Sequence, residues 1–78
     1  MTRVTWEQTG RVYTGTLPGV ASHSAIVRPA IGEPGMWEAR VKDHRQARQE
    51  PETRHRTPEA ARRKAGERLR AAVKEAGR

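Results

Sequence analysis

Residues 35–43 read GMWEARVKD, and this stretch decides the fold that we expect the chain to adopt. Apolar and charged residues alternate along it, with Trp37, Ala39 and Val41 set against Glu38, Arg40 and Lys42. A period of two places successive side chains on opposite faces of a β-strand, one facing a core and the other facing water. The stretch therefore predicts a half-buried strand that continues to about residue 45 and presents Arg40 and Lys42 on its outer face.

Three more strands are predicted upstream of this one. Residues 3–7 (RVTWE) and 11–17 (RVYTGTL) are rich in β-formers and are separated by the turn signal QTG. The segment PGVAS breaks the second run, and residues 23–31 (HSAIVRPAI) form a third run with Pro29 near its end. GEPG at residues 32–35 is a tight, glycine-containing connection, so the third and fourth strands are predicted to form a hairpin.

A charged loop is predicted over about residues 46–56. Residues 46–52 (QARQEPE) show no apolar period and contain Pro51, as is typical of a turn or loop. Residues 53–56 (TRHR) could return from this loop as a short edge strand, an alternative that the sequence leaves open.

The end of the chain carries the clearest helix signals. Thr57 is a suitable N-cap, Pro58 suits the first helical position, and Gly77 follows the last periodic residue, which predicts a helix over 58–76. At 100° per residue its apolar face is made of small residues with two larger ones: Ala61, Ala65, Leu69, Ala72, Val73 and Ala76. Such a face allows a close approach to a sheet.

Together these elements predict an α+β fold, an antiparallel sheet of three to four strands packed against one C-terminal α-helix. The chain of 78 residues is expected to be a single small domain (1–78), with the sheet at about 3–45, the charged loop at about 46–56 and the helix at about 58–76. Phe is absent and large apolar residues are few, so the core should be thin. A homodimer that adds to this core is an open alternative.

Several classes of protein and site are disfavoured by the composition. The chain has no cysteine, which excludes a disulfide framework and a thiolate zinc site. No apolar run approaches the length of a membrane span, so we expect a cytoplasmic protein with no membrane partner. The Arg- and Ala-rich composition suggests a bacterial or phage source.

Residues suited to catalysis are scarce. The chain contains three histidines (His23, His44 and His55) and one aspartate, Asp43, in no metal-ligand or nucleophile-base spacing. His44 and His55 could face each other across a charged hairpin, but no third ligand accompanies them. We therefore expect a non-enzymatic protein with no catalytic residue, no metal and no cofactor.

The net charge of +7 is concentrated in one half of the chain. Residues 1–39 carry three basic and three acidic residues, whereas residues 40–78 carry thirteen basic and six acidic ones. A charge confined in this way favours a polyanion-binding face, so the sequence predicts a small basic nucleic-acid-binding protein, with duplex DNA as the favoured partner.

The predicted contact residues lie on the outer face of the sheet and beyond it. The central ones are Arg28, Arg40 and Lys42, and the flanking ones are Arg45, Arg54 and Arg56. A secondary basic stripe on the helix consists of Arg63, Arg70 and Lys74. The alternative for both sets is a polar face that contacts only water.

The pattern also resembles a known family. GMWEARVKD, a basic stretch and then TPEAARRKAGERL are similar to the β-hairpin-plus-helix core of the plant ethylene-response-factor DNA-binding domain, and to the related arm-type N-terminal domain of phage tyrosine integrases. The matching places, over about residues 24–72, are Gly35, Trp37, Ala39, Val41 and residues 57–60. The resemblance implies that the outward positions of the sheet read DNA, which here are Arg40 and Lys42 with Arg28 on the preceding strand.

Two alternatives of another class remain open. The chain also resembles the HicB-like antitoxin domain, in which three strands precede a helix that begins Thr-x-Glu-Ala, and this would imply a toxin partner. More generally, a phage-type inhibitor or adaptor could dock on an acidic host protein through the same basic face or through the sheet edge near TRHR. A structural phage component, which would self-assemble, is a third interpretation.

Overall fold

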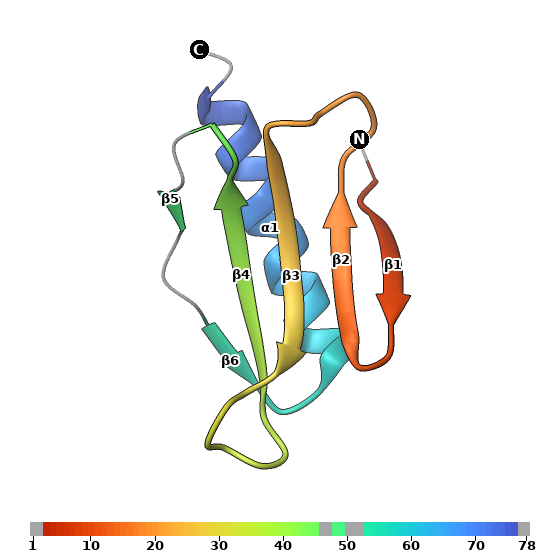
Figure 1. Cartoon of the computed structure of the whole chain (residues 1–78). Helices are drawn as coiled ribbons and strands as arrows, with labels where there is room; N and C mark the ends of the chain where they lie inside the picture. Colours follow the sequence, from red (N-terminus) through yellow and green to blue (C-terminus); the bar gives the residue numbers. More distant parts are fainter. Residues whose placement is uncertain (1–2, 46–47, 50–52, 77–78) are drawn as a thin grey trace.

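The computed structural model of the chain describes residues 3–45, 48–49 and 53–76, and it shows one antiparallel sheet packed on one helix (Figure 1). The α+β class predicted from the sequence is confirmed. The strands are β1 (Thr5–Thr9), β2 (Val12–Thr16), β3 (His23–Pro29), β4 (Trp37–Asp43), β5 (Arg48–Gln49) and β6 (Thr53–His55), and the helix is α1 (Pro58–Ala76).

The first four strands form a meander in the order β1-β2-β3-β4. The far edge of β4 is shared by the two shortest strands: β6 pairs with its first half, at Trp37 to Ala39, and β5 pairs with its last two residues. In the described part of the chain the sheet is therefore five positions wide, and the prediction of three to four strands is wrong in its count. Strands of two and three residues are too short to show a period in the sequence.

The region predicted as a charged loop at 46–56 thus contains two short strands, and the edge strand proposed for TRHR is present as Thr53–His55. The rest of that loop, at 46–47 and 50–52, lies outside the described residues.

The predicted hairpin between the third and fourth strands is confirmed. β3 and β4 pair along their full lengths, from His23 opposite Asp43 to Pro29 opposite Trp37. The GEPG connection between them contains Gly32 and Gly35, whose φ angles of 80° and 84° lie in the left-handed region that glycine adopts at little cost. This hairpin brings Arg28 of β3 directly opposite Glu38 of β4.

Helix α1 has the bounds that its capping signals predict. Thr57 Oγ1 accepts a hydrogen bond of 3.1 Å from the backbone N–H of Ala60, which satisfies one of the donors left free at a helix start. Pro58 occupies the first helical position, where its missing N–H costs nothing.

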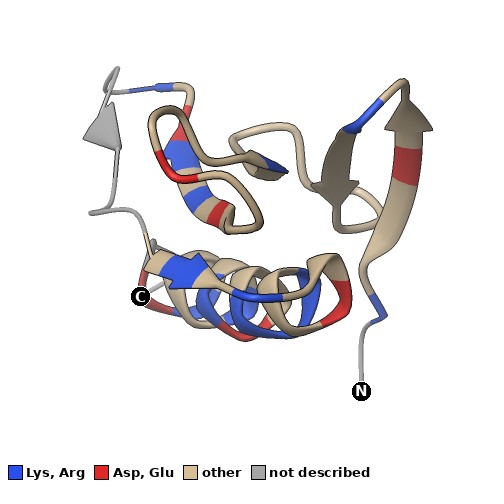
Figure 2. Cartoon of the chain, turned by 90° about the horizontal axis from the view of Figure 1, so that it is seen from below, with Lys and Arg blue, Asp and Glu red and all other residues tan. Residues whose placement is uncertain are grey.

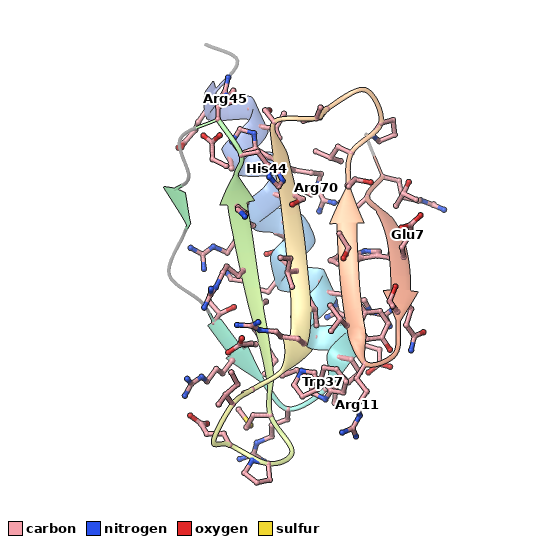
Figure 3. All side chains as sticks on the ribbon, viewed as in Figure 1. Glu7, Arg11, Trp37, His44, Arg45 and Arg70 are labelled. Carbon is pink, nitrogen blue, oxygen red and sulfur yellow. The ribbon has the colours of Figure 1, made fainter. Side chains whose placement is uncertain are left out.

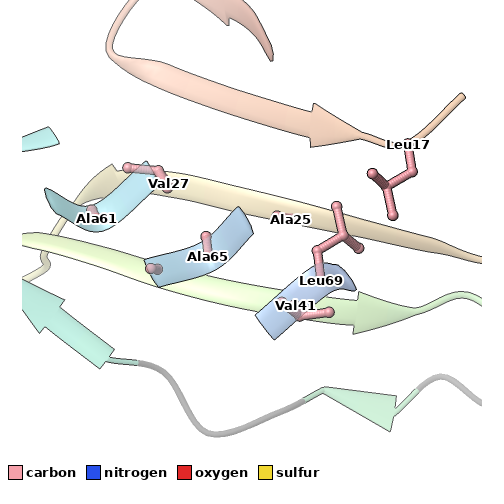
Figure 4. Close-up of a cluster of buried hydrophobic side chains, with 8 residues drawn as sticks. Leu17, Ala25, Val27, Val41, Ala61, Ala65 and Leu69 are labelled. Atoms are coloured by element: carbon pink, nitrogen blue, oxygen red, sulfur yellow. The ribbon is translucent and has the colours of Figure 1, made fainter. Parts of the chain in front are cut away.

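The core lies between α1 and the central strands (Figure 4). Ala61, Ala65 and Leu69 of the helix are buried against Ala25 and Val27 of β3 and against two β4 residues, Ala39 and Val41. Leu17, which follows β2, completes the buried cluster. Alanine on both sides lets the helix approach the sheet closely, as the apolar face of the helix predicted.

An aromatic group closes the core at the start of the helix. The rings of Tyr13 and Trp37 have centroids 6.1 Å apart and are tilted by 59°, and the guanidinium of Arg62 lies 4.6 Å above the Tyr13 ring. In Figure 1, α1 lies behind the sheet, and no described element covers the front face. None of the described helical residues form a segment long and apolar enough to cross a membrane.

Candidate nucleic-acid interface

Four of the predicted contact residues gather on the uncovered face of the sheet. We call Arg28 of β3, Arg40 and Lys42 of β4, and Arg54 of β6 the outer-face cluster. The register places Arg28 and Arg54 on either side of Glu38, and it places Arg40 and Lys42 further along the same strand. The alternation that predicted an outward basic face on β4 therefore extends across three adjacent strands.

Carboxylates hold two of these arginines in position. Arg28 Nε donates a hydrogen bond to Glu38 Oε1, and Arg54 Nη1 donates one to Glu33 Oε1. Glu38 is only 4 % exposed although no helix covers it. The long side chains beside it therefore shield it from water. Lys42, by contrast, has no carboxylate within ion-pair distance in the described residues. The cluster is thus positively charged overall, with the heads of Arg28 and Arg54 oriented by Glu38 and Glu33.

The other two predicted flanking residues do not join the cluster. Arg45 lies beyond the end of β4, where its backbone N–H and its side chain both contact Asp43 Oδ1 at 3.0 and 3.4 Å (Figure 3). Arg56 is exposed and follows β6, which pairs with the opposite end of β4. Arg45 and Arg56 therefore lie at opposite ends of this strand.

The predicted helix stripe lies on the other side of the sheet. Figure 2 shows basic residues both on the sheet and along α1, which packs against the opposite face of the sheet from the outer-face cluster. Arg63 and Arg70 line a groove between α1 and the segment around β1, and Lys74 is exposed nearer the end of the helix. A single flat surface cannot contact this stripe and the outer-face cluster together.

The start of β3 and the end of β4 carry a chain of polar contacts on the helix side. Ser22 Oγ and His23 Nδ1 are 2.8 Å apart, and His23 Nε2 is 3.4 Å from Asp43 Oδ2. Desolvation raises the pKa of Asp43, but hydrogen bonds from Arg45 and the charges of His23 and Arg45 outweigh it and hold this pKa below its ordinary value of 3.8. His23 is only 4 % exposed, so these contacts serve to tie β3 to β4.

The two histidines that could have faced each other are far apart. His44 Nε2 is 2.8 Å from Ser24 Oγ beyond the end of β4, while His55 Nε2 is 2.9 Å from Thr53 Oγ1 near the start of β4. The idea that they meet across a hairpin is therefore wrong, because they lie at the two ends of one strand. Among the described residues, no three His, Cys, Asp or Glu side chains gather in a metal-binding group.

Two features of the charged surface escaped the sequence analysis. The first is that Glu38, which the alternation places on the outer face with Arg40 and Lys42, is buried there and accepts a hydrogen bond from Arg28. The second is the groove, because Arg3 and Trp6 come from the N-terminal segment and approach the helix only in the fold. Comparison with protein-family models, with curated proteins and with solved structures finds no match to this chain.

Proposed function

We propose that this protein is a non-enzymatic nucleic-acid-binding protein that contacts duplex DNA with the outer face of its sheet. The observation that carries the proposal is the outer-face cluster, in which four basic side chains lie on three adjacent strands of a face that no described element covers. The proposal implies a cytoplasmic protein of a bacterium or phage.

The dimensions of this face support a duplex as the partner. Neighbouring strands are about 4.8 Å apart, so β3, β4 and β6 span roughly 10 Å from the first strand to the third. The major groove of B-DNA is about 12 Å wide and accepts β-ribbons as well as helices. A basic strip of this width can face that groove or lie along a phosphate backbone.

The chemistry of the cluster supports a role in contacting phosphates. Arg28 is oriented by the buried carboxylate of Glu38, which reduces the entropy that its side chain would lose on binding. Its side chain remains 41 % exposed and is accessible to a ligand.

The direct test is a titration of labelled duplex DNA, single-stranded DNA and duplex RNA, followed by fluorescence anisotropy at several salt concentrations. If the four cations neutralise four phosphates, the logarithm of the affinity for duplex DNA should fall against the logarithm of salt with a slope of about −3.6. The salt slope is informative because it counts phosphate contacts whether or not the contact is sequence-specific.

A pair of matched variants locates the surface. Arg40→Glu/Lys42→Glu should abolish most duplex binding and flatten the salt slope by about 2. The control is Arg11→Glu/Lys64→Glu, which makes the same change in charge at two exposed positions outside the cluster. Equal losses in the two variants, with both folded, would contradict the proposal, because net charge and not the cluster would then decide affinity.

The protein-docking alternative predicts a different result from the same titration. An inhibitor or adaptor that uses the outer face, or the edge strand β6 at TRHR, would bind no nucleic acid even at low salt. It would instead bind one acidic protein in a fixed stoichiometry. The absence of binding to all three nucleic acids would therefore replace our proposal with this one.

A further inference from the structure

The groove between α1 and the N-terminal segment is the second concentration of positive charge. It is an open groove of about 440 Å³, within the range of about 300–1,000 Å³ that is typical of ligand sites. One wall is made by Arg3, Val4 and Trp6, and the opposite wall comes from the first three turns of α1. We name it the Trp6 groove.

The helix wall presents two arginines with a glycine between them. Arg63, Gly66 and Arg70 are spaced i, i+3 and i+7 and so lie along one side of the helix, with the two arginines about 10 Å apart along its axis. A Cβ at Gly66 would lie 3.6 Å from both Val4 Cγ2 and Arg70 Nη1, and Gly66 is buried, so the glycine lets Val4 and the Arg70 guanidinium lie close over the helix.

The cations of the groove are largely unneutralised. Arg3, Arg63 and Arg70 have no ion pair within the described part of the chain, whereas Arg62 lies 3.8 Å from Glu59. Four arginines thus face one carboxylate. Such an arrangement attracts a ligand that carries several negative charges.

Trp6 gives the groove an aromatic wall. Its six-membered ring lies against Gly15 of β2, where an added Cβ would be only 2.8 Å from Cη2 and Cζ3. The indole is half-buried and also lines the groove. Gly15 therefore fixes the position of the ring, and the helix residues that line the same groove include Arg62, Arg63 and Arg70.

We propose that the Trp6 groove binds single-stranded nucleic acid, with phosphates on Arg63 and Arg70 and one base stacked on Trp6. A positively charged groove that contains an aromatic platform is how proteins hold single strands without reading their sequence. A duplex keeps its bases stacked and out of reach of Trp6, so the ligand must be unpaired. This inference concerns a different surface from the outer-face cluster and does not depend on it.

The test uses Trp37→Phe protein, in which Trp6 is the remaining tryptophan. An unlabelled oligothymidylate of about 12 nucleotides should quench the fluorescence of Trp6 in a saturable way. Heparin, which carries sulfates but no base, should occupy the arginines without quenching. Equal quenching by heparin would overturn the stacking contact, and the absence of any quenching at low salt would overturn the proposal.

Charge variants separate this groove from the outer face. Arg63→Glu/Arg70→Glu should weaken oligothymidylate binding by about tenfold or more and flatten its salt slope by about 1.4. Arg11→Glu/Lys64→Glu is the control, because it has the same change in charge and Lys64 lies on the same helix outside the groove. Thermal melts confirm that both variants fold.

Two outcomes overturn the assignment while leaving the outer-face proposal intact. In the first, Arg40→Glu/Lys42→Glu reduces the affinity for oligothymidylate and Arg63→Glu/Arg70→Glu does not. Single strands would then bind on the outer face. Binding of thymidine monophosphate as tight as that of the oligonucleotide would make the groove a site for a free nucleotide. Conversely, both sites would be supported if the outer-face variant loses only duplex binding and the groove variant loses only oligothymidylate binding.

Discussion

The outer-face cluster and the Trp6 groove are both rich in arginine, but they differ in how far carboxylates neutralise these arginines. On the outer face, Arg28 and Arg54 contact the carboxylates of Glu38 and Glu33. In the groove, Arg63 and Arg70 have no ion pair within the described residues. The arginines of the outer face are thus preorganised but partly neutralised. Arg63 and Arg70 of the groove are not neutralised in this way, and the groove also contains the indole of Trp6. A surface of oriented side chains suits a rigid duplex, and a charged groove with an aromatic wall suits a flexible strand.

The core that both surfaces share gives the largest expected effect. Leu69 is completely buried between α1 and the sheet, so Leu69→Ala should destabilise the domain by about 2–5 kcal/mol through lost burial and a cavity. A domain of this size has only about 3–5 kcal/mol from a single core, so much of the variant should be unfolded at 37 °C. Urea denaturation followed by tryptophan fluorescence measures the loss.

The two binding activities should then fall together in Leu69→Ala, in proportion to the unfolded fraction. The conservative variant Leu69→Met keeps the volume and should cost less than about 1.5 kcal/mol. A Leu69→Ala protein that loses one activity and keeps the other would show that the two surfaces do not depend on the same folded unit.

The packing of Trp6 on Gly15 offers a change that alters the groove and leaves the outer-face cluster in place. Gly15→Ala places a methyl group 2.8 Å from ring atoms of Trp6, so the ring must move, at an expected cost of about 1–3 kcal/mol. Oligothymidylate binding should weaken, while duplex binding by the folded protein should stay unchanged. The emission spectrum of Trp6 in the Trp37→Phe background reports the displacement.

Gly66 is the matched control for this change, because its effect on stability should have the opposite sign. A Cβ at Gly66 meets its nearest atoms at 3.6 Å, which is ordinary contact, and alanine is favoured over glycine inside a helix by about 0.5–1 kcal/mol. Gly66→Ala should therefore raise the melting temperature. If both glycine variants destabilised the protein equally, the close contact between Trp6 and Gly15 would not be the cause.

These glycines show what the sequence can and cannot predict. Alternation, turn glycines and capping residues predicted four strands and the helix, since each signal is local to its own element. β5 and β6 are too short to show a period, and only the pairing of β4 reveals that they extend the sheet. Trp6 and Arg63 are separated by most of the chain, so no spacing in the sequence indicates that they share a groove.

The outer-face residues were easier to predict than their interactions. The alternation of side chains along β4 placed Arg40 and Lys42 on the outer face, and it placed Glu38 there as well. Glu38 is buried because Arg28 on β3 and the strand β6 lie on either side of it. This arrangement follows from the register of the strands and not from the sequence pattern. The sequence therefore identified the cations of this face, whereas their carboxylate partners required the structure.

A change at Glu38 tests whether the outer-face cluster and the Trp6 groove differ in how far their charge is neutralised. Glu38→Gln keeps an oxygen that can accept the Arg28 hydrogen bond but removes the negative charge, which should cost on the order of 1 kcal/mol, since Arg28 is 41 % exposed and solvent screens the pair. Duplex affinity should rise, because Arg28 is then no longer neutralised by a carboxylate. Oligothymidylate binding in the groove should not change. A fall in duplex affinity would instead show that orientation of Arg28 matters more than net charge.

The smallest effect should come from the acid dependence of Asp43, which lies at the end of β4 on the side away from the outer-face cluster. Because its pKa is lowered in the folded state, its ionised form stabilises the fold at pH values above 3.8, and this contribution is lost as the pH falls through the lowered value. Asp43→Asn keeps an oxygen for the Arg45 N–H but cannot titrate, so its stability should fall less steeply below about pH 4. Urea midpoints measured from pH 5 to pH 2.5 test this. An equally steep fall in both proteins would mean that Asp43 does not control the response of the fold to acid.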